Sequence, residues 1–162
     1  QFRAGFDPRF EKSDLGWDMT PSSMLWILTA FADRYGMPLF ITESGLADGS
    51  EPDTKRTRYL SGVLQALDEA LRRGVDLRGY TYWSLLDNFE WQAGYRPRFG
   101  LARTDYDSMA RTLRPSSSML RDVIRRQQQP RSEKSPSRRR KGSGKEASPP
   151  IHRPPAVQRQ HS

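Results

Sequence analysis

Only two segments of this sequence read as buried β-strands, and a helical pattern separates them. Residues 39–42 are apolar or β-branched and end at a polar loop that begins with Ser44 and Gly45. Residues 75–86 carry strand-forming side chains at odd and even positions alike, which is typical of a strand covered on both faces. A helix between two strands favours parallel pairing. Because two parallel strands alone leave both sheet edges unpaired, the pattern predicts further strands, most economically the earlier part of a larger α/β domain.

Three segments carry apolar residues at helical spacing. The first runs from residue 24 to residue 35 and stops at Gly36. The second begins at Asp53, a suitable N-cap, and ends at Gly74, which follows two arginines. The third follows Pro115. The sequence therefore predicts the order helix, strand, helix, strand, loop, helix.

The positive charge of the chain lies almost entirely in its last residues. The formal net charge is +8, and residues 127–162 hold nine Lys and Arg against two Asp and Glu. This stretch has no aromatic residue and too few apolar ones to offset the entropy of ordering, so we expect a disordered basic tail. Its run at residues 138–141 could bind nucleic acid, but without aromatic residues for base stacking a solvated tail is the favoured interpretation, and a nucleic-acid partner is not expected.

The composition excludes several kinds of active site. The chain has no Cys, and its two His, at positions 152 and 161, both lie in the tail. A thiolate zinc site, a cysteine nucleophile and a Ser-His-Asp triad are therefore excluded from residues 1–126. No residue set suggests a metal or an organic cofactor. Carboxylate chemistry remains.

No segment has the length of a membrane span. The most apolar stretch, residues 24–32, is far shorter than the roughly 20 residues that a membrane helix needs. The chain opens with Gln1 rather than Met and shows no signal-peptide pattern. We therefore expect no membrane partner, a cytoplasmic location and a chain that is cut at its N-terminus.

A carboxylate stands at the end of the first predicted strand. Glu43 is followed by Ser44 and Gly45, so its side chain would project from the carboxyl end of the strand. In parallel α/β folds this edge of the sheet carries the functional sites. On position alone, however, a glutamate at a strand end is more often solvated or a cap.

The second strand ends in an unusual cluster at residues 83–91, with two tryptophans and two carboxylates. Such a set suits a carbohydrate, because sugar rings stack on Trp and their hydroxyl groups hydrogen-bond to carboxylates and indole N–H groups. The alternative is that Trp83 and Trp91 are core aromatics and that Asp87 forms a turn or a helix cap. Composition alone leaves both interpretations open.

At these residues the sequence resembles a known family. Residues 41–45 (ITESG), 83–91 (WSLLDNFEW) and 95–101 (YRPRFGL) are similar to the C-terminal motifs of glycoside hydrolase family 1, the β-glucosidases and their relatives. The motifs agree in order and spacing. The resemblance covers about residues 14–125.

The resemblance implies an α/β fold of a definite kind, a (β/α)8 TIM barrel. Residues 39–43 would form its seventh strand and residues 80–86 its eighth, so the chain would hold the last two βα units. On this view residues 1–126 are the C-terminal part of a family 1 barrel, and residues 127–162 are the appended basic tail.

The resemblance also implies a role for each site residue in a retaining β-glycosidase that acts on β-glucosides or related β-glycosides. Glu43 would be the catalytic nucleophile that forms a covalent glycosyl-enzyme. Trp83 would be the platform beneath the sugar, Glu90 would accept hydrogen bonds from its hydroxyls, Trp91 would add an indole N–H, and Phe99 would line the same pocket. The family requires no metal or cofactor.

Two departures from the family pattern matter. Ser44 stands where the family usually has Asn, a small polar replacement that leaves the carboxylate in place. The Asn-Glu-Pro motif that supplies the family's acid/base carboxyl group does not occur in this chain. We therefore expect a fragment that needs the missing N-terminal portion of the barrel. The alternatives are a non-catalytic sugar-binding or protein-binding relative and an inactive truncated product.

Overall fold

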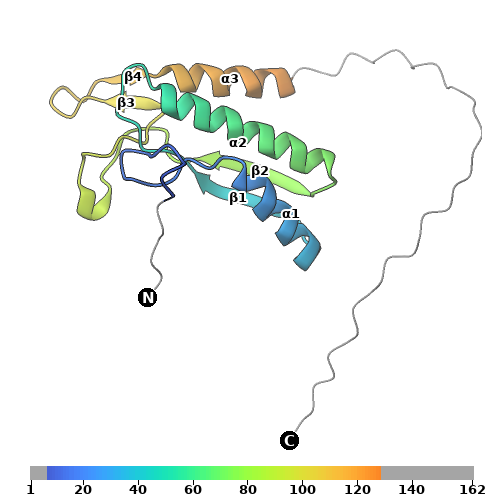
Figure 1. Cartoon of the computed structure of the whole chain (residues 1–162). Coiled ribbons are helices and arrows are strands. Elements are labelled where there is room, and N and C mark those ends of the chain that lie inside the picture. Colours follow the sequence, from blue (N-terminus) through green and yellow to red (C-terminus); the bar gives the residue numbers. More distant parts are fainter. Residues whose placement is uncertain (1–6, 129–162) are drawn as a thin grey trace, which may run out of the picture. The chain divides into compact units, whose positions relative to one another are not determined.

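The computed structural model describes residues 7–128 and follows the predicted order of helices and strands (Figure 1). The elements, in chain order, are α1 (Ser23–Tyr35), β1 (Leu39–Ser44), α2 (Thr54–Arg72), β2 (Leu77–Tyr82), η1 (Trp91–Ala93), β3 (Ala102–Thr104), β4 (Arg111–Leu113) and α3 (Pro115–Gln128). The three predicted helices and two predicted strands are confirmed. α3 includes residues 127 and 128, which the charge pattern groups with the tail. The expected disorder beyond Gln128 concerns positions outside the described residues.

β1 and β2 pair in parallel, as the helix between them predicts. Leu39 lies opposite Leu77, and Ser44 lies opposite Tyr82. Both strands therefore end at the same edge of the sheet. Since α2 connects them, the three elements form one βαβ unit.

The core lies on one face of this sheet. Leu28 of α1 packs with Val63, Leu67 and Ala70 of α2, and the strand residue Leu39 contacts this cluster. A second cluster joins α2, β2 and α3 and contains the buried residues Leu60, Tyr82 and Leu101. In Figure 1, α1 and α3 lie on either side of α2, in agreement with the contacts of these helices. The three helices thus cover the same side of the strands.

Within residues 7–128 nothing packs on the opposite face of the sheet, so the expectation of a strand covered on both faces is wrong for this part of the chain. Phe40, Thr42 and Thr81 are exposed there. The Phe40 ring lies over Gly79, where an added Cβ would stand 2.1 Å from a ring carbon. The strand-forming side chains on this face have no second layer within residues 7–128 to pack against.

The predicted loop after β2 contains an antiparallel hairpin that the sequence did not reveal. Arg103 of β3 lies opposite Thr112 of β4, and each strand has three residues. A parallel bridge between Leu86 and Ala102 attaches the hairpin to the chain that follows β2. Strands this short carry too few side chains to show a period of two.

A buried polar network fixes the starts of α2 and α3. The Asp53 carboxylate accepts hydrogen bonds from Arg56 at 2.8 Å and from the Ser116 hydroxyl at 2.5 Å. The guanidinium of Arg56 also donates to the backbone oxygens of Asp48 and Arg98. Burial acts to raise the pKa of Asp48, but hydrogen bonds from Ser50 and from the Arg56 N–H hold that pKa below its usual value.

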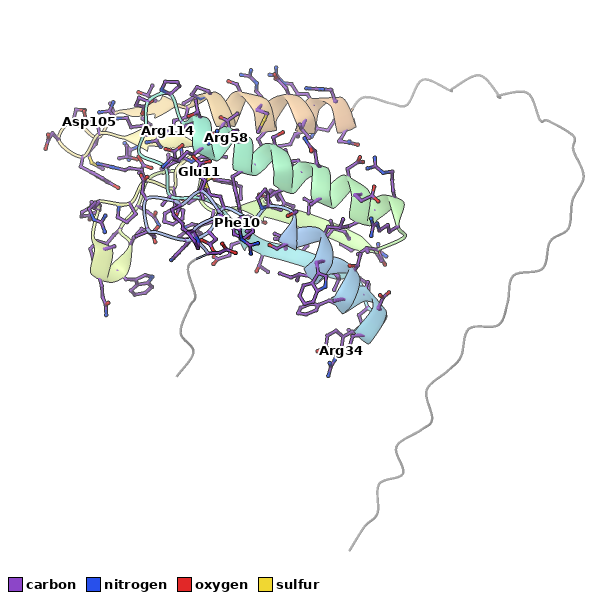
Figure 2. All side chains as sticks on the ribbon, viewed as in Figure 1. Phe10, Glu11, Arg34, Arg58, Asp105 and Arg114 are labelled. Carbon is purple, nitrogen blue, oxygen red and sulfur yellow. The ribbon has the colours of Figure 1, made fainter. Side chains whose placement is uncertain are left out.

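Residues before α1 are tied to α2 at the surface. Glu11 and Arg58 lie side by side in Figure 2 and form an ion pair at 2.6 Å. Both side chains are exposed, so we assign the contact little stabilisation. No helix among residues 7–128 is both long and apolar enough to cross a membrane.

Candidate functional site at the carboxyl ends of the parallel strands

The ends of β1 and β2 are in direct backbone contact. The Trp83 N–H donates to the Ser44 carbonyl at 3.0 Å, immediately beyond the last paired residues. The Tyr80 hydroxyl donates to the same carbonyl at 3.4 Å. The residues that follow the two strands therefore lie next to each other, as parallel pairing requires.

An irregularity in β1 determines which way Glu43 faces. Three steps along β1, from Ile41 to Ser44, correspond to two steps along β2, from Tyr80 to Tyr82. A register shift of this kind, such as a β-bulge produces, redirects a side chain at a sheet edge. Thr42 and Glu43 are both exposed as a result, although successive residues of a regular strand point to opposite faces.

Ser44 faces α2, on the side opposite the uncovered face. Its hydroxyl lies 3.4 Å from the Tyr59 hydroxyl on α2. The replacement at this position therefore gives a polar contact between strand and helix, and it leaves the Glu43 carboxylate at the exposed edge.

Trp83 and Glu90 are brought together by the loop that links them. The Trp83 indole N–H donates to the Glu90 carboxylate at 3.3 Å. Trp83 is 38% exposed, so within residues 7–128 it is not a core tryptophan. An open indole face beside a carboxylate is the arrangement that a sugar ring with its hydroxyl groups requires.

Trp91 and Phe99 lie differently from each other. Trp91 is 83% exposed and begins η1, one residue past Glu90. Phe99 is only 3% exposed, and its ring packs against Trp17 with the centroids 6.1 Å apart. In this chain Phe99 lies buried behind the loop of residues 83–91 and offers no open surface to a ligand.

Asp87 is a residue whose role the sequence did not reveal. It lies in no turn and at no helix start, and its buried carboxylate pairs with Arg114 at 3.0 Å. Arg114 immediately precedes α3, and Figure 2 shows it where the hairpin and α3 meet. The two residues are 27 positions apart, so no local pattern could have predicted the pair.

Burial changes the acidity of two tyrosines beneath the site. Desolvation raises the pKa of Tyr82 to about 12 and raises the pKa of Tyr80 above its ordinary value. Both hydroxyls are therefore neutral near pH 7. They act as hydrogen-bond donors to backbone carbonyls, Tyr80 to Ser44 and Tyr82 to Phe99.

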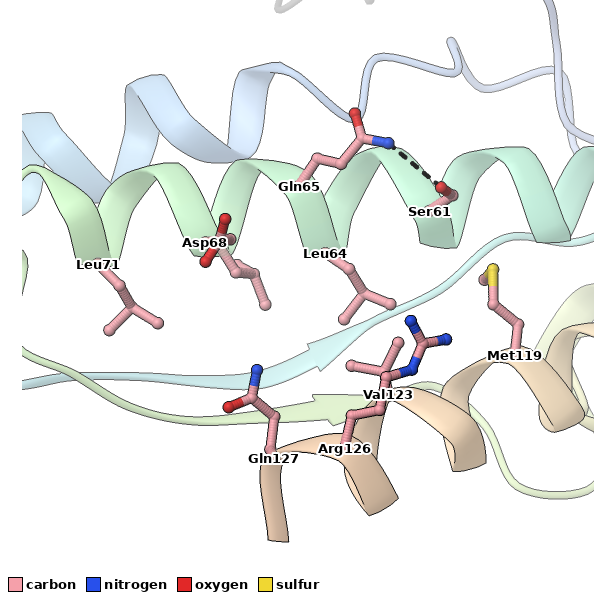
Figure 3. Close-up of a pocket in the computed structure, with 10 residues that line it drawn as sticks. Ser61, Leu64, Gln65, Asp68, Leu71, Met119, Val123, Arg126 and Gln127 are labelled. Carbon is pink, nitrogen blue, oxygen red and sulfur yellow. Dashed lines mark hydrogen bonds between the residues drawn. The ribbon is translucent and has the colours of Figure 1, made fainter. Parts of the chain in front are cut away.

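A cavity elsewhere contains none of the five predicted site residues. It has a volume of about 670 Å³ and lies between α2 and α3, lined by Leu64, Leu71, Met119 and Val123 among others (Figure 3). Within residues 7–128 no group of three or more His, Cys, Asp or Glu could hold a metal ion. The chemistry-bearing side chains gather at the strand ends and on the loop after β2.

Comparison with known proteins places the chain in a family. The family model described as glycosyl hydrolase family 1 matches residues 1–129. A beta-galactosidase of Sulfolobus acidocaldarius is 41% identical over 113 residues, and beta-glucosidase A of Acetivibrio thermocellus is 37% identical over 136 residues. These matches cover 70% and 75% of this chain.

The fold also matches solved structures. A beta-glucosidase from Thermotoga maritima in complex with methoxycarbonyl-substituted glucoimidazole aligns with a TM-score of 0.71 and 35% identity over 74% of this chain. The chain spans 29% of that structure and 23% and 30% of the two curated relatives. It therefore matches under a third of each relative. The α/β fold and the family match agree, and this chain belongs to glycosyl hydrolase family 1.

Proposed function

We propose that this chain supplies the nucleophile half of the active site of a retaining β-glycosidase. The observation that carries the proposal is the position of Glu43. This residue is exposed at the carboxyl end of β1, beside the register shift, and it lies next to the end of β2, which Trp83 follows. Beta-glucosidases and a beta-galactosidase are among the relatives, so the substrate class is a β-glucoside or a related β-glycoside.

In the proposed reaction a Glu43 carboxylate oxygen attacks the anomeric carbon of the sugar. A carbon–oxygen bond to Glu43 forms as the bond to the aglycone oxygen breaks, and an acid group gives that oxygen a proton. Water then attacks the same carbon, returns a proton to that group and frees Glu43. Two displacements retain the anomeric configuration.

Trp83 and Glu90 would hold the sugar during both steps. The exposed indole of Trp83 offers a stacking surface, and the Glu90 carboxylate keeps acceptor capacity beyond its bond to Trp83. Trp91, exposed beside them, would donate its indole N–H to the sugar. Phe99 would support this wall from behind, where it packs on Trp17.

The acid group must come from a barrel complement, by which we mean the further strands and helices that complete the barrel. Such a complement would pair with the free edges of β1 and β2. It would also cover the uncovered face, where Phe40 is exposed. Apolar surface and unpaired strand edges of this kind are otherwise costly in water.

The test joins this chain to a defined complement. We would co-express it with the part of Acetivibrio thermocellus beta-glucosidase A that it does not match, and we call the product the complemented chain. We expect β-glucosidase turnover with retained configuration. Glu43→Ala should lower kcat by at least about 10³-fold, since it removes the group that forms the covalent intermediate.

Added azide distinguishes a lost nucleophile from a disturbed fold. In the Glu43→Ala protein azide can enter the vacated space and attack the anomeric carbon, which should restore turnover and give the α-glycosyl azide. Asp33→Ala, which removes an exposed carboxylate from α1, should leave kcat unchanged. A complemented chain that unfolds cooperatively but gives no turnover, or one that retains turnover after Glu43→Ala, contradicts the proposal. Failure of the two parts to associate would also contradict it.

A further inference from the structure

We propose that the buried Asp87–Arg114 ion pair is a positioning device that holds the loop of residues 83–91 in the geometry needed for sugar binding. This inference rests on the proposed function, because it concerns the placement of Trp83 and Glu90. Neither Asp87 nor Arg114 would touch the substrate.

The two side chains form a bidentate ion pair, which we call the clamp. Arg114 Nη1 lies 3.0 Å from one carboxylate oxygen of Asp87, and Nη2 lies 3.1 Å from the other. The side chains are 2% and 0% exposed. A bidentate guanidinium–carboxylate contact fixes orientation as well as distance, and away from water it is little screened.

The same carboxylate also holds backbone groups from two other segments. Asp87 accepts hydrogen bonds from the N–H groups of Gly100 at 2.9 Å and Thr104 at 3.2 Å. Arg114 donates in turn to the Gly100 carbonyl at 2.7 Å. The clamp therefore fastens the loop of residues 83–91 to β3 and to the residue that immediately precedes α3.

Asp87 is the last fastened residue before Glu90. Backbone hydrogen bonds join Ser84, Leu85 and Asp87 to the segment of residues 99–102. Within residues 7–128, no described hydrogen bond ties residues 88 and 89 to another element. The path from the clamp to Glu90 is thus three residues long. The Trp83 indole also holds the Glu90 carboxylate, and the Phe89 ring packs on Tyr95, so the clamp fixes the start of a loop whose end these contacts complete.

A second buried ion pair provides a matched control. Asp53 and Arg56 are both 0% exposed, lie 2.8 Å apart and also bond the beginning of α3 through Ser116. Neither Asp53 nor Arg56 has a described bond to residues 83–91. Loss of either carboxylate should reduce stability, because it removes the nearest acidic partner of a buried arginine. Arg98 lies 3.7 Å from Asp87 and Glu51 lies 3.5 Å from Arg114 as further partners. Only loss of the Asp87 pair should disturb the sugar-binding loop.

The first arm of the test is kinetic and uses the complemented chain. Asp87→Asn should raise KM for a β-glucoside about tenfold with kcat within about threefold of wild type, because it weakens ground-state and transition-state binding alike. Arg114→Lys keeps the positive charge but loses the two-point guanidinium contact, so its KM should lie between those of wild type and Asp87→Asn. Asp53→Asn should leave KM within about twofold. The pH dependence of kcat should be unchanged in all three.

The second arm needs no turnover and also uses the complemented chain. Backbone amide exchange of residues 88–94 should be about tenfold faster in Asp87→Asn than in wild type, and unchanged in Asp53→Asn. If Asp87→Asn does not fold, Arg114→Lys gives the same comparison with the charge retained. Equal exchange in these variants and wild type would overturn the inference.

The two arms separate the inference from the proposed function. No turnover by the wild-type complemented chain, together with the expected change in exchange, would refute the proposed function and leave the positioning role standing. Normal turnover with equal KM for Asp87→Asn and Asp53→Asn would refute the positioning role alone.

Discussion

Gly45 lies against the backbone of Trp83 so closely that a Cβ at Gly45 would stand 1.7 Å from the Trp83 carbonyl oxygen. This contact joins the residue two positions after Glu43 to the start of the loop of residues 83–91. The obstacle is backbone rather than a flexible side chain, so it cannot rotate away. Gly45 is therefore required by close approach of the two strand ends.

Gly45→Ala should consequently displace one strand end from the other. We expect a loss of about 3 kcal/mol or more in the free energy of unfolding of the complemented chain, together with reduced turnover. Gly36→Ala is the control, since an added Cβ there meets no atom within 4 Å and costs only the positive φ of 59°, about 1 kcal/mol. Urea unfolding measures both. Equal losses for the two variants would show that the strand ends do not touch as described.

Acidification should destabilise the fold through Asp48. Because its pKa is lowered in the folded chain from the ordinary 3.8, Asp48 contributes stability above about pH 4, and this contribution is lost as the pH falls through the folded pKa. Asp48→Asn should lower stability at pH 6 and flatten the decline towards pH 3. Thermal melts of the complemented chain between pH 3 and pH 6 measure the effect, with Asp33→Asn, at an exposed residue, as the control. If the stability of Asp48→Asn falls between pH 6 and pH 3 as steeply as that of wild type, the assignment is contradicted.

The alkaline limit should depend on Tyr82. Burial raises its folded pKa to about 12, above the ordinary 10.0, so the stability it contributes is complete below pH 10 and is lost as the pH rises towards 12. In the complemented chain, Tyr82→Phe should therefore reduce the fall in the free energy of unfolding between pH 10 and pH 12, as measured by urea unfolding. Exposed Tyr35→Phe should not. If both variants follow the wild-type curve, the Tyr82 hydroxyl is not kept neutral by burial.

The uncovered face should make the chain alone behave differently from the complemented chain. Phe40 and the free strand edges leave apolar and hydrogen-bonding surface in water, so we expect the chain alone to bind a hydrophobic dye and to give no cooperative melt. The complement should abolish dye binding. Phe40→Ser should reduce it in the chain alone. A cooperative melt of the chain alone, together with β-glucosidase activity, would contradict this prediction.

The sequence predicted the elements whose signals are local. α1 and its end at Gly36, the parallel strands and α2 from Asp53 all follow from apolar spacing and from residues that start or stop a helix. The expectation of a covered second face was wrong because strand-forming side chains on both faces show only that each face can pack against a layer. Within residues 7–128 the three helices pack on one side only.

The features that sequence reasoning missed depend on contacts between distant residues. No residue near Glu43 signals the register shift that exposes it, because register is set by the pairing with β2. The Asp87–Arg114 pair and the β3–β4 hairpin likewise join segments that only the fold brings together. The motifs predict which residues form the site, whereas the orientation of their side chains could not be predicted from them.

The central claim is that Glu43 forms the covalent bond to the sugar, and trapping that bond tests it most directly. The complemented chain would be incubated with an activated 2-deoxy-2-fluoro-β-glucoside, whose fluorine slows release of the glycosyl-enzyme. It would then be digested with trypsin and mapped by mass spectrometry. We predict one added 2-deoxy-2-fluoroglucosyl group, on the peptide of residues 35–55 and at Glu43. A label at any other carboxylate, or none in a preparation that turns over substrate, would contradict the account.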